Sequence, residues 1–91
     1  MATTNFTVTD TYQLVVAAAE TWFLVSSRKT DLVEFATTAA DGTLPDAAIE
    51  GHVIRADAGI SRALLQGGAV FVRLASREKP GHTVKISVDA G

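Results

Sequence analysis

Brief runs in which apolar and polar residues alternate recur along this chain. The alternation is clear in residues 6–9 and again in residues 31–37. A period of two is typical of β-strands that bury one face and leave the other in water. We therefore predict strands in both segments, with Val33 and Phe35 of the second directed into the core.

Two further segments are more apolar than simple alternation allows. Residues 12–18 are rich in β-branched residues and end in alanines. A buried helical turn would also fit them, but β-branched residues are locally dense, so we favour a strand. Residues 21–25 are apolar on both parities, which predicts a central strand covered on both faces. The polar residues 26–29 then predict a hairpin loop.

The last two predicted strands show the clearest patterns. Residues 69–76 place aliphatic side chains on one face, opposite Phe71 and Arg73. Residues 82–89 alternate aliphatic side chains with polar ones such as Lys85. We expect each strand to have one dry face and one wet face, as in an antiparallel sheet.

Turn residues divide the remaining sequence. Residues 39–50 contain an Asp-Gly pair and Pro45, which predict a long surface loop in which residues 45–49 make at most one helical turn. A short strand is expected at 51–55, a tight turn at 57–59, a strand or irregular edge at 60–65 and a turn at 67–68. Together the segments predict an all-β chain: one antiparallel β-sandwich domain of about eight short strands over residues 1–91. The strand order, immunoglobulin-like or jelly-roll-like, is left open by the pattern.

Composition adds an expectation about assembly. The chain has 91 residues and no cysteine, and 47% of its residues are hydrophobic while 20% are charged. A domain this small buries only roughly 60–65% of its unfolded surface and has no disulfide or thiolate metal site to supplement its core. We therefore expect part of the apolar surplus to lie in an interface between subunits, the alternative being aggregation in isolation.

The charge pattern excludes some partners. The net charge is −2, and no cluster of cations stands out along the chain. Binding to a nucleic-acid backbone requires several cations on one face, so no nucleic-acid partner is expected. No run approaches the roughly 20 apolar residues of a membrane span, and the polar residues 1–9 do not resemble a signal peptide. Synthesis in the cytoplasm, with no membrane partner, is the expectation.

No catalytic, metal or cofactor site is expected. His52 and His82 lie about thirty positions apart with no local third ligand, so a zinc site is not predicted, and a pH-sensitive interface histidine is the alternative. Ser61 lacks the second glycine of a nucleophile elbow. The Gly67-Gly68 pair lacks a phosphate-binding pattern. No spacing singles out two of the acids as a catalytic pair or a calcium loop; these acids are Asp31, Glu34, Asp41, Asp46, Glu50 and Asp57.

The aromatic residues supply candidates for an interface instead. Trp22 beside Phe23 in an apolar strand is typical of a core, but an outward-facing ring there would anchor a contact with another protein. The candidate interface residues are Trp22, Phe23, Phe71, Pro45 and Ile49.

The order of the apolar segments suggests a family. Segments 22–25, 33–35, 51–55, 60–62, 70–73 and 84–88 follow one another in that order. This arrangement resembles the small β-sandwich proteins on the virion surface of tailed phages and phage-like particles, such as head decoration or cement proteins and the bases of head spikes or fibres. The resemblance covers nearly the whole chain and rests on strand pattern and length.

This resemblance implies a virion structural protein that is not an enzyme. It would form a small symmetric homo-oligomer and bind the major capsid protein or a spike or fibre protein, with residues 1–5 and the loop 39–50 as candidate contact segments. The chain lacks a long flexible arm, so a tail or baseplate accessory protein is an alternative. The other alternative is a carbohydrate- or receptor-binding module with an aromatic platform built from Trp22, Tyr12 or Phe71.

Overall fold

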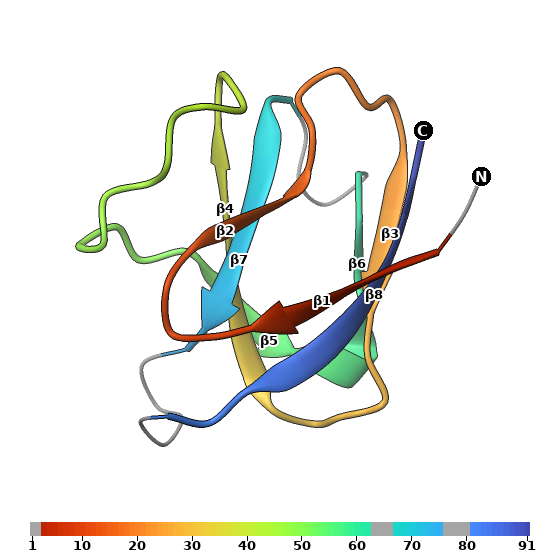
Figure 1. Cartoon of the computed structure of the whole chain (residues 1–91), viewed down its shortest axis with the longest axis vertical. Helices are drawn as coiled ribbons and strands as arrows, with labels where there is room; N and C mark the ends of the chain where they lie inside the picture. Colours follow the sequence, from red (N-terminus) through yellow and green to blue (C-terminus); the bar gives the residue numbers. More distant parts are fainter. Residues whose placement is uncertain (1–2, 63–66, 76–80) are drawn as a thin grey trace.

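Two four-stranded antiparallel sheets pack against each other in the computed structural model, which describes residues 3–62, 67–75 and 81–91 (Figure 1). Sheet A has the strand order β1-β8-β3-β6, and sheet B has the order β2-β7-β4-β5. The strands are β1 (Thr4–Val8), β2 (Gln13–Val16), β3 (Phe23–Ser26), β4 (Leu32–Thr38), β5 (His52–Arg55), β6 (Ile60–Ser61), β7 (Ala69–Leu74) and β8 (Val84–Ala90), with a short 3-10 helix, η1 (Ala56–Ala58), after β5. The predicted β-sandwich is confirmed.

The two halves of the chain pair as one long antiparallel ribbon. β1 pairs with β8, β2 with β7, β3 with β6 and β4 with β5. The ribbon turns back at residues 39–51 and folds over, so that β3 also pairs with β8 and β4 with β7. This pairing is the strand order of an eight-stranded jelly roll. Of the two orders that the sequence left open, the structure has the jelly roll.

Side chains that alternate along the strands build the core between the sheets. Val33 and Phe35 of β4 are 0% and 2% exposed, as predicted. On β8, Ile86 and Val88 are buried while Lys85 is exposed. Residues 12–18 contain strand β2, and the turn in which Glu20 donates its N–H to the Ala17 carbonyl follows the strand, which confirms the preference for a strand there.

The prediction that residues 21–25 are covered on both faces is wrong. β3 does lie inside its sheet, between β8 and β6, but only Phe23 and Val25 point into the core. Trp22 and Leu24 are exposed because no described segment covers the outer face of sheet A at this point. The predicted hairpin at 26–29 is also wrong, since β3 and β4 belong to different sheets and residues 27–31 cross from one sheet to the other.

The prediction of a wet outer face for β7 is wrong as well. Phe71 points away from the main core, yet it is 0% exposed. It belongs to a second apolar cluster, with Tyr12, Ala36 and Ala69, on the outer side of sheet B. The connection between β4 and β5, residues 39–51, is hydrogen-bonded to side chains of this sheet and shields the face from water (Figure 1).

The turn predictions hold with small changes. The turn at 57–59 is η1 followed by Gly59, whose φ of 73° suits a glycine. In the long loop, Ile49 donates its N–H to the Asp46 carbonyl in a single turn. Gly68, in the turn after β6, has a φ of 50° and lies so close to the Thr38 carbonyl that a β-carbon would overlap it. The edge strand β6 is Ile60–Ser61, and residues 63–65 of the predicted segment 60–65 lie outside the described residues.

Candidate functional site

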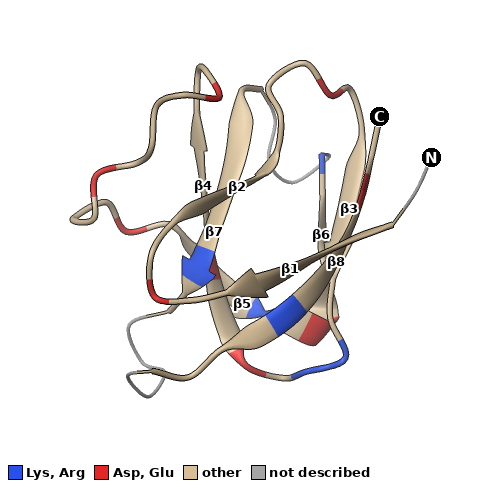
Figure 2. Cartoon of the chain, viewed as in Figure 1, with Lys and Arg blue, Asp and Glu red and all other residues tan. Residues whose placement is uncertain are grey.

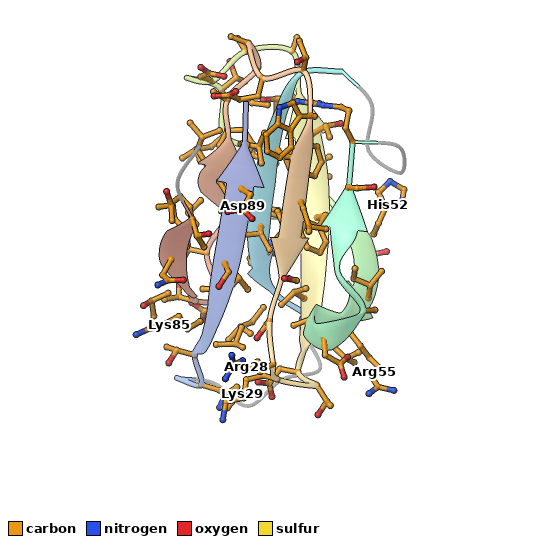
Figure 3. The ribbon with its side chains drawn as sticks, turned by 90° about the vertical axis from the view of Figure 1, so that its right-hand side faces the viewer. Arg28, Lys29, His52, Arg55, Lys85 and Asp89 are labelled. Atoms are coloured by element: carbon orange, nitrogen blue, oxygen red, sulfur yellow. The ribbon has the colours of Figure 1, made fainter. Side chains whose placement is uncertain are left out.

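The outer face of sheet A carries a pair of exposed apolar side chains. Trp22 and Gly91 exchange backbone N–H···O=C hydrogen bonds of 3.0 and 3.1 Å, which extends the β3–β8 ladder by one pair. Trp22 and Leu24 are two residues apart along the same extended strand, so their side chains lie on the same face of the sheet. They are 45% and 49% exposed. Asp89 is directly opposite Leu24 on β8 (Figure 3).

This pair is a departure from the rest of the face. The outward positions of the neighbouring strands are polar, namely Asn5, Thr7, Lys85, Ser87, Asp89, Ser26 and Ser61. Two large apolar side chains within such a face are surface that water solvates poorly, and exposed apolar groups rimmed by polar ones are typical of protein contact sites. We define Trp22 and Leu24 as the apolar pair of sheet A.

The outer side of sheet B holds a buried polar network instead. The Glu34 carboxylate accepts hydrogen bonds from the Tyr12 hydroxyl at 3.3 Å, from the Gly51 N–H at 3.0 Å and from the Arg73 guanidinium at 3.1 Å. Arg73 also donates to the Ala47 carbonyl at 2.9 Å, and its guanidinium lies 4.1 Å from the centroid of the Tyr12 ring.

Electrostatics and burial in this network favour a structural role. Burial raises the pKa of the Tyr12 hydroxyl; the Arg73 guanidinium opposes this shift and the Glu34 charge adds to it. The single O–H of Tyr12 is shared between the Glu34 carboxylate and the Ile49 carbonyl, which lies 3.0 Å from the hydroxyl oxygen, and Arg73 donates to the same carbonyl at 2.9 Å. The polar groups are thus used to fasten the connection 39–51 onto the sheet. A carboxylate, a phenol and a guanidinium that satisfy one another and the backbone in this way hold a loop in place.

Sequence reasoning missed this network, although one signal was present. Glu34 and Arg73 each interrupt an otherwise apolar strand, and they are direct cross-strand partners. Opposite charges in two apolar strands suggest a buried pair once the strands are known to be neighbours. That neighbourhood follows only from the jelly-roll order.

The predicted interface residues fall into two groups. Trp22 is exposed, Ile49 is 51% exposed on the connection 39–51, and Pro45 of the same connection is partly buried. Phe23 and Phe71 are 3% and 0% exposed, so the structure removes both from the candidates because their rings fill the two apolar clusters.

The remaining chemical candidates stay apart. His52 begins β5 and is exposed, whereas the His82 ring lies 3.1 Å from the Asp31 carboxylate. Within the described part of the chain, no three His, Cys, Asp or Glu side chains gather as metal ligands. Ser61 points outward on β6, and the neighbouring Arg62 donates to the Glu20 carbonyl at 2.7 Å.

Comparisons with protein-family models, with curated proteins and with solved structures found no match. Among the described residues, no helix is both long enough and apolar enough to span a membrane.

Proposed function

We propose that this protein is a structural subunit that assembles with copies of itself into a small symmetric oligomer, as on the surface of a phage-like particle. The apolar pair of sheet A, Trp22 and Leu24, carries the proposal. The jelly-roll order supports it because this architecture recurs in viral capsid proteins. Since lectins and cupins share that architecture, the exposed pair and not the fold is what favours assembly.

The exposed area shows how strong such a contact can be. A tryptophan presents up to roughly 250 Å², so an exposed fraction of 45% leaves about 110 Å² of Trp22 in water. At about 25 cal/mol per Å², burying this area contributes ~2.5 kcal/mol. Leu24, half exposed, adds about 1 kcal/mol by the same measure.

A second copy of the chain is the partner with which the apolar pair gives the largest gain from buried area. In an isologous contact both copies bury their own Trp22 and Leu24, so the total gain reaches about 7 kcal/mol. The cost of association is at least ~4 kcal/mol. The contact is therefore weak between free subunits. It becomes strong where a particle holds several copies side by side, because the effective concentration rises.

A capsid, spike or fibre protein would meet a different surface. Ile49 and Leu44 are 51% and 60% exposed on the connection 39–51. The network of Tyr12, Glu34 and Arg73 holds this connection in one conformation, which lowers the ordering cost of binding through it. Two separate apolar surfaces suit a subunit that contacts its own copies and a neighbouring protein.

Sedimentation velocity at high protein concentration tests the proposal. A surplus of about 3 kcal/mol corresponds to a dissociation constant of several millimolar, so we expect the wild-type sedimentation coefficient to rise as the protein reaches several millimolar and that of Leu24→Lys to stay at the monomer value. Val53→Lys is the matched control, since Val53 is 44% exposed on the outer side of β5 and the charge change is the same. A wild type that stays monomeric at several millimolar protein, or equal dissociation of the two variants, would overturn the proposal.

The exposed indole also favours a second candidate, a carbohydrate-binding module. Trp22 would be its only platform residue from the predicted set, because Tyr12 and Phe71 are buried. Glycan-array binding by wild type that disappears in Trp22→Ala and persists in Leu24→Lys would favour this candidate over self-assembly.

A further inference from the structure

Unpaired cations gather at one place on this acidic chain. Of the described Lys and Arg residues, three are held within the fold: Arg55 pairs with Asp57 at 2.9 Å, Arg73 pairs with Glu34 at 3.1 Å, and Arg62 donates to backbone carbonyls. The other three are Arg28, Lys29 and Lys85, and no described acidic side chain lies within ion-pair distance of them.

All three of these cations line the same hollow. It has a volume of about 430 Å³ and lies on the outer face of sheet A, at the end away from Trp22. Its walls are Asn5 of β1, Ser26 of β3, Ser27, Arg28 and Lys29 of the connection to β4, and Lys85 and Ser87 of β8. Figure 3 shows Arg28, Lys29 and Lys85 at this end of the face, and Figure 2 shows β8 and the connection coloured as basic there. No described lining residue is acidic.

Hydrogen bonds fix the walls of this hollow. The Ser27 hydroxyl donates to the Lys85 carbonyl at 3.0 Å and accepts the Lys29 N–H at 3.0 Å, which ties the connection to β8. The Ser87 hydroxyl donates to the Asn5 side-chain oxygen at 3.0 Å. The Asn5 amide group therefore keeps its N–H donors for a ligand. The backbone around the cations is thus held in place before any ligand binds.

We propose that this hollow binds a phosphate or sulfate monoester. Three cations with hydroxyl and amide donors match a compact group of one or two negative charges that has several acceptor oxygens. The volume falls within the range of small-molecule sites, so the ester's carbon skeleton fits as well. The three cations that the described residues supply are fewer than the roughly six to ten phosphate contacts that a nucleic-acid-binding protein can make, and they favour a small anion.

This inference does not depend on self-assembly. The hollow and the apolar pair lie at opposite ends of one sheet face, so either can be present without the other. On a particle surface, a site of this kind would recognise anionic esters on a sugar polymer or a lipid headgroup. The chemistry is shared by these sources, and the probes below separate them.

Backbone amide NMR with defined probes tests the proposal. Glucose 6-phosphate should shift the resonances of residues 26–29 and 85–87 at concentrations where glucose does not. Inorganic phosphate, glucose 6-sulfate, and vesicles with phosphatidic acid, whose phosphate is a monoester, against phosphatidylcholine vesicles identify the source. If inorganic phosphate binds as tightly as the esters, the hollow is a site for free phosphate and the proposal of an ester ligand is wrong. If only the vesicles bind, the ligand is a lipid phosphate.

Two variants with the same charge change separate a site from general attraction. Lys85→Gln should weaken glucose 6-phosphate binding by roughly three- to tenfold, because one of three charged donors is lost. Arg55→Gln removes an exposed cation elsewhere and should change binding by less than about twofold. No shift with any ester, equal weakening in both variants, or tighter binding of duplex DNA than of every ester would overturn the proposal.

Discussion

Removal of the Glu34 carboxylate tests whether the polar network holds the connection 39–51 on sheet B. Glu34 is 4% exposed and accepts three hydrogen bonds, from Tyr12, Gly51 and Arg73. Glu34→Ala deletes the carboxylate oxygen, Oε2, that accepts all three hydrogen bonds. Arg73 keeps its two backbone carbonyls, but the counter-charge of a guanidinium side chain that is only 13% exposed is gone.

The size of the effect follows from these contacts. Breaking a buried ion pair by removing one partner costs about 3–5 kcal/mol, and the carbonyls that still accept from Arg73 place the loss near the lower end. A chain of 91 residues has a total stability of about 5–13 kcal/mol. We therefore expect Glu34→Ala to lower the free energy of unfolding by ~3 kcal/mol, a large share of the total.

Urea denaturation followed by far-UV circular dichroism measures the loss. Arg55→Ala is the control, since the Arg55–Asp57 pair is at the surface and its removal should cost less than about 1 kcal/mol. The double variant Glu34→Leu with Arg73→Met should be more stable than Glu34→Ala, because no charge is then left buried. A loss in Glu34→Ala no larger than that of the control would refute the argument.

Two further predictions concern the same side of the molecule. Burial raises the folded-state pKa of the Tyr12 hydroxyl, so as the pH rises Tyr12 loses its proton in the unfolded chain before it does in the folded protein. The stability that comes from this difference is present below about pH 10 and is lost as the pH rises through the folded-state pKa of Tyr12. Tyr12→Phe should flatten that alkaline decline in urea midpoint. A β-carbon on Gly51 would overlap the Phe35 carbonyl, so Gly51→Ala should cost about 1–3 kcal/mol, whereas Gly42→Ala, with open space around it, should cost less than about 0.5 kcal/mol.

Local patterns predicted the strands because each strand's alternation depends on its own residues. Val33 and Phe35 face the core as expected, and the strand predicted at 82–89 is β8, which begins at Val84 and ends at Ala90. The two wrong burial predictions, at β3 and β7, have one cause. Whether an outer face is wet depends on which connection crosses it, and the connection 39–51 covers sheet B. That placement is a property of the topology.

The candidate site was predicted only in part, for the same reason. Trp22 was predicted to anchor an interface if its ring faced outward, and its side chain is exposed. Leu24, the other residue of the apolar pair, was predicted to be buried. The basic hollow was not foreseen, because Arg28 and Lys29 are about 56 residues from Lys85 and meet it only through the pairing of β3 with β8.

The fluorescence of Trp22 tests the central claim most directly, because it is the only tryptophan in the chain. In the monomer its side chain is 45% exposed, and in the proposed oligomer it is buried. Dilution from several millimolar protein, near the expected dissociation constant, to micromolar protein should move the emission to longer wavelength and increase quenching by iodide. Emission and quenching that stay constant over this range, at the values of the dissociated Leu24→Lys variant, would contradict self-assembly through this face.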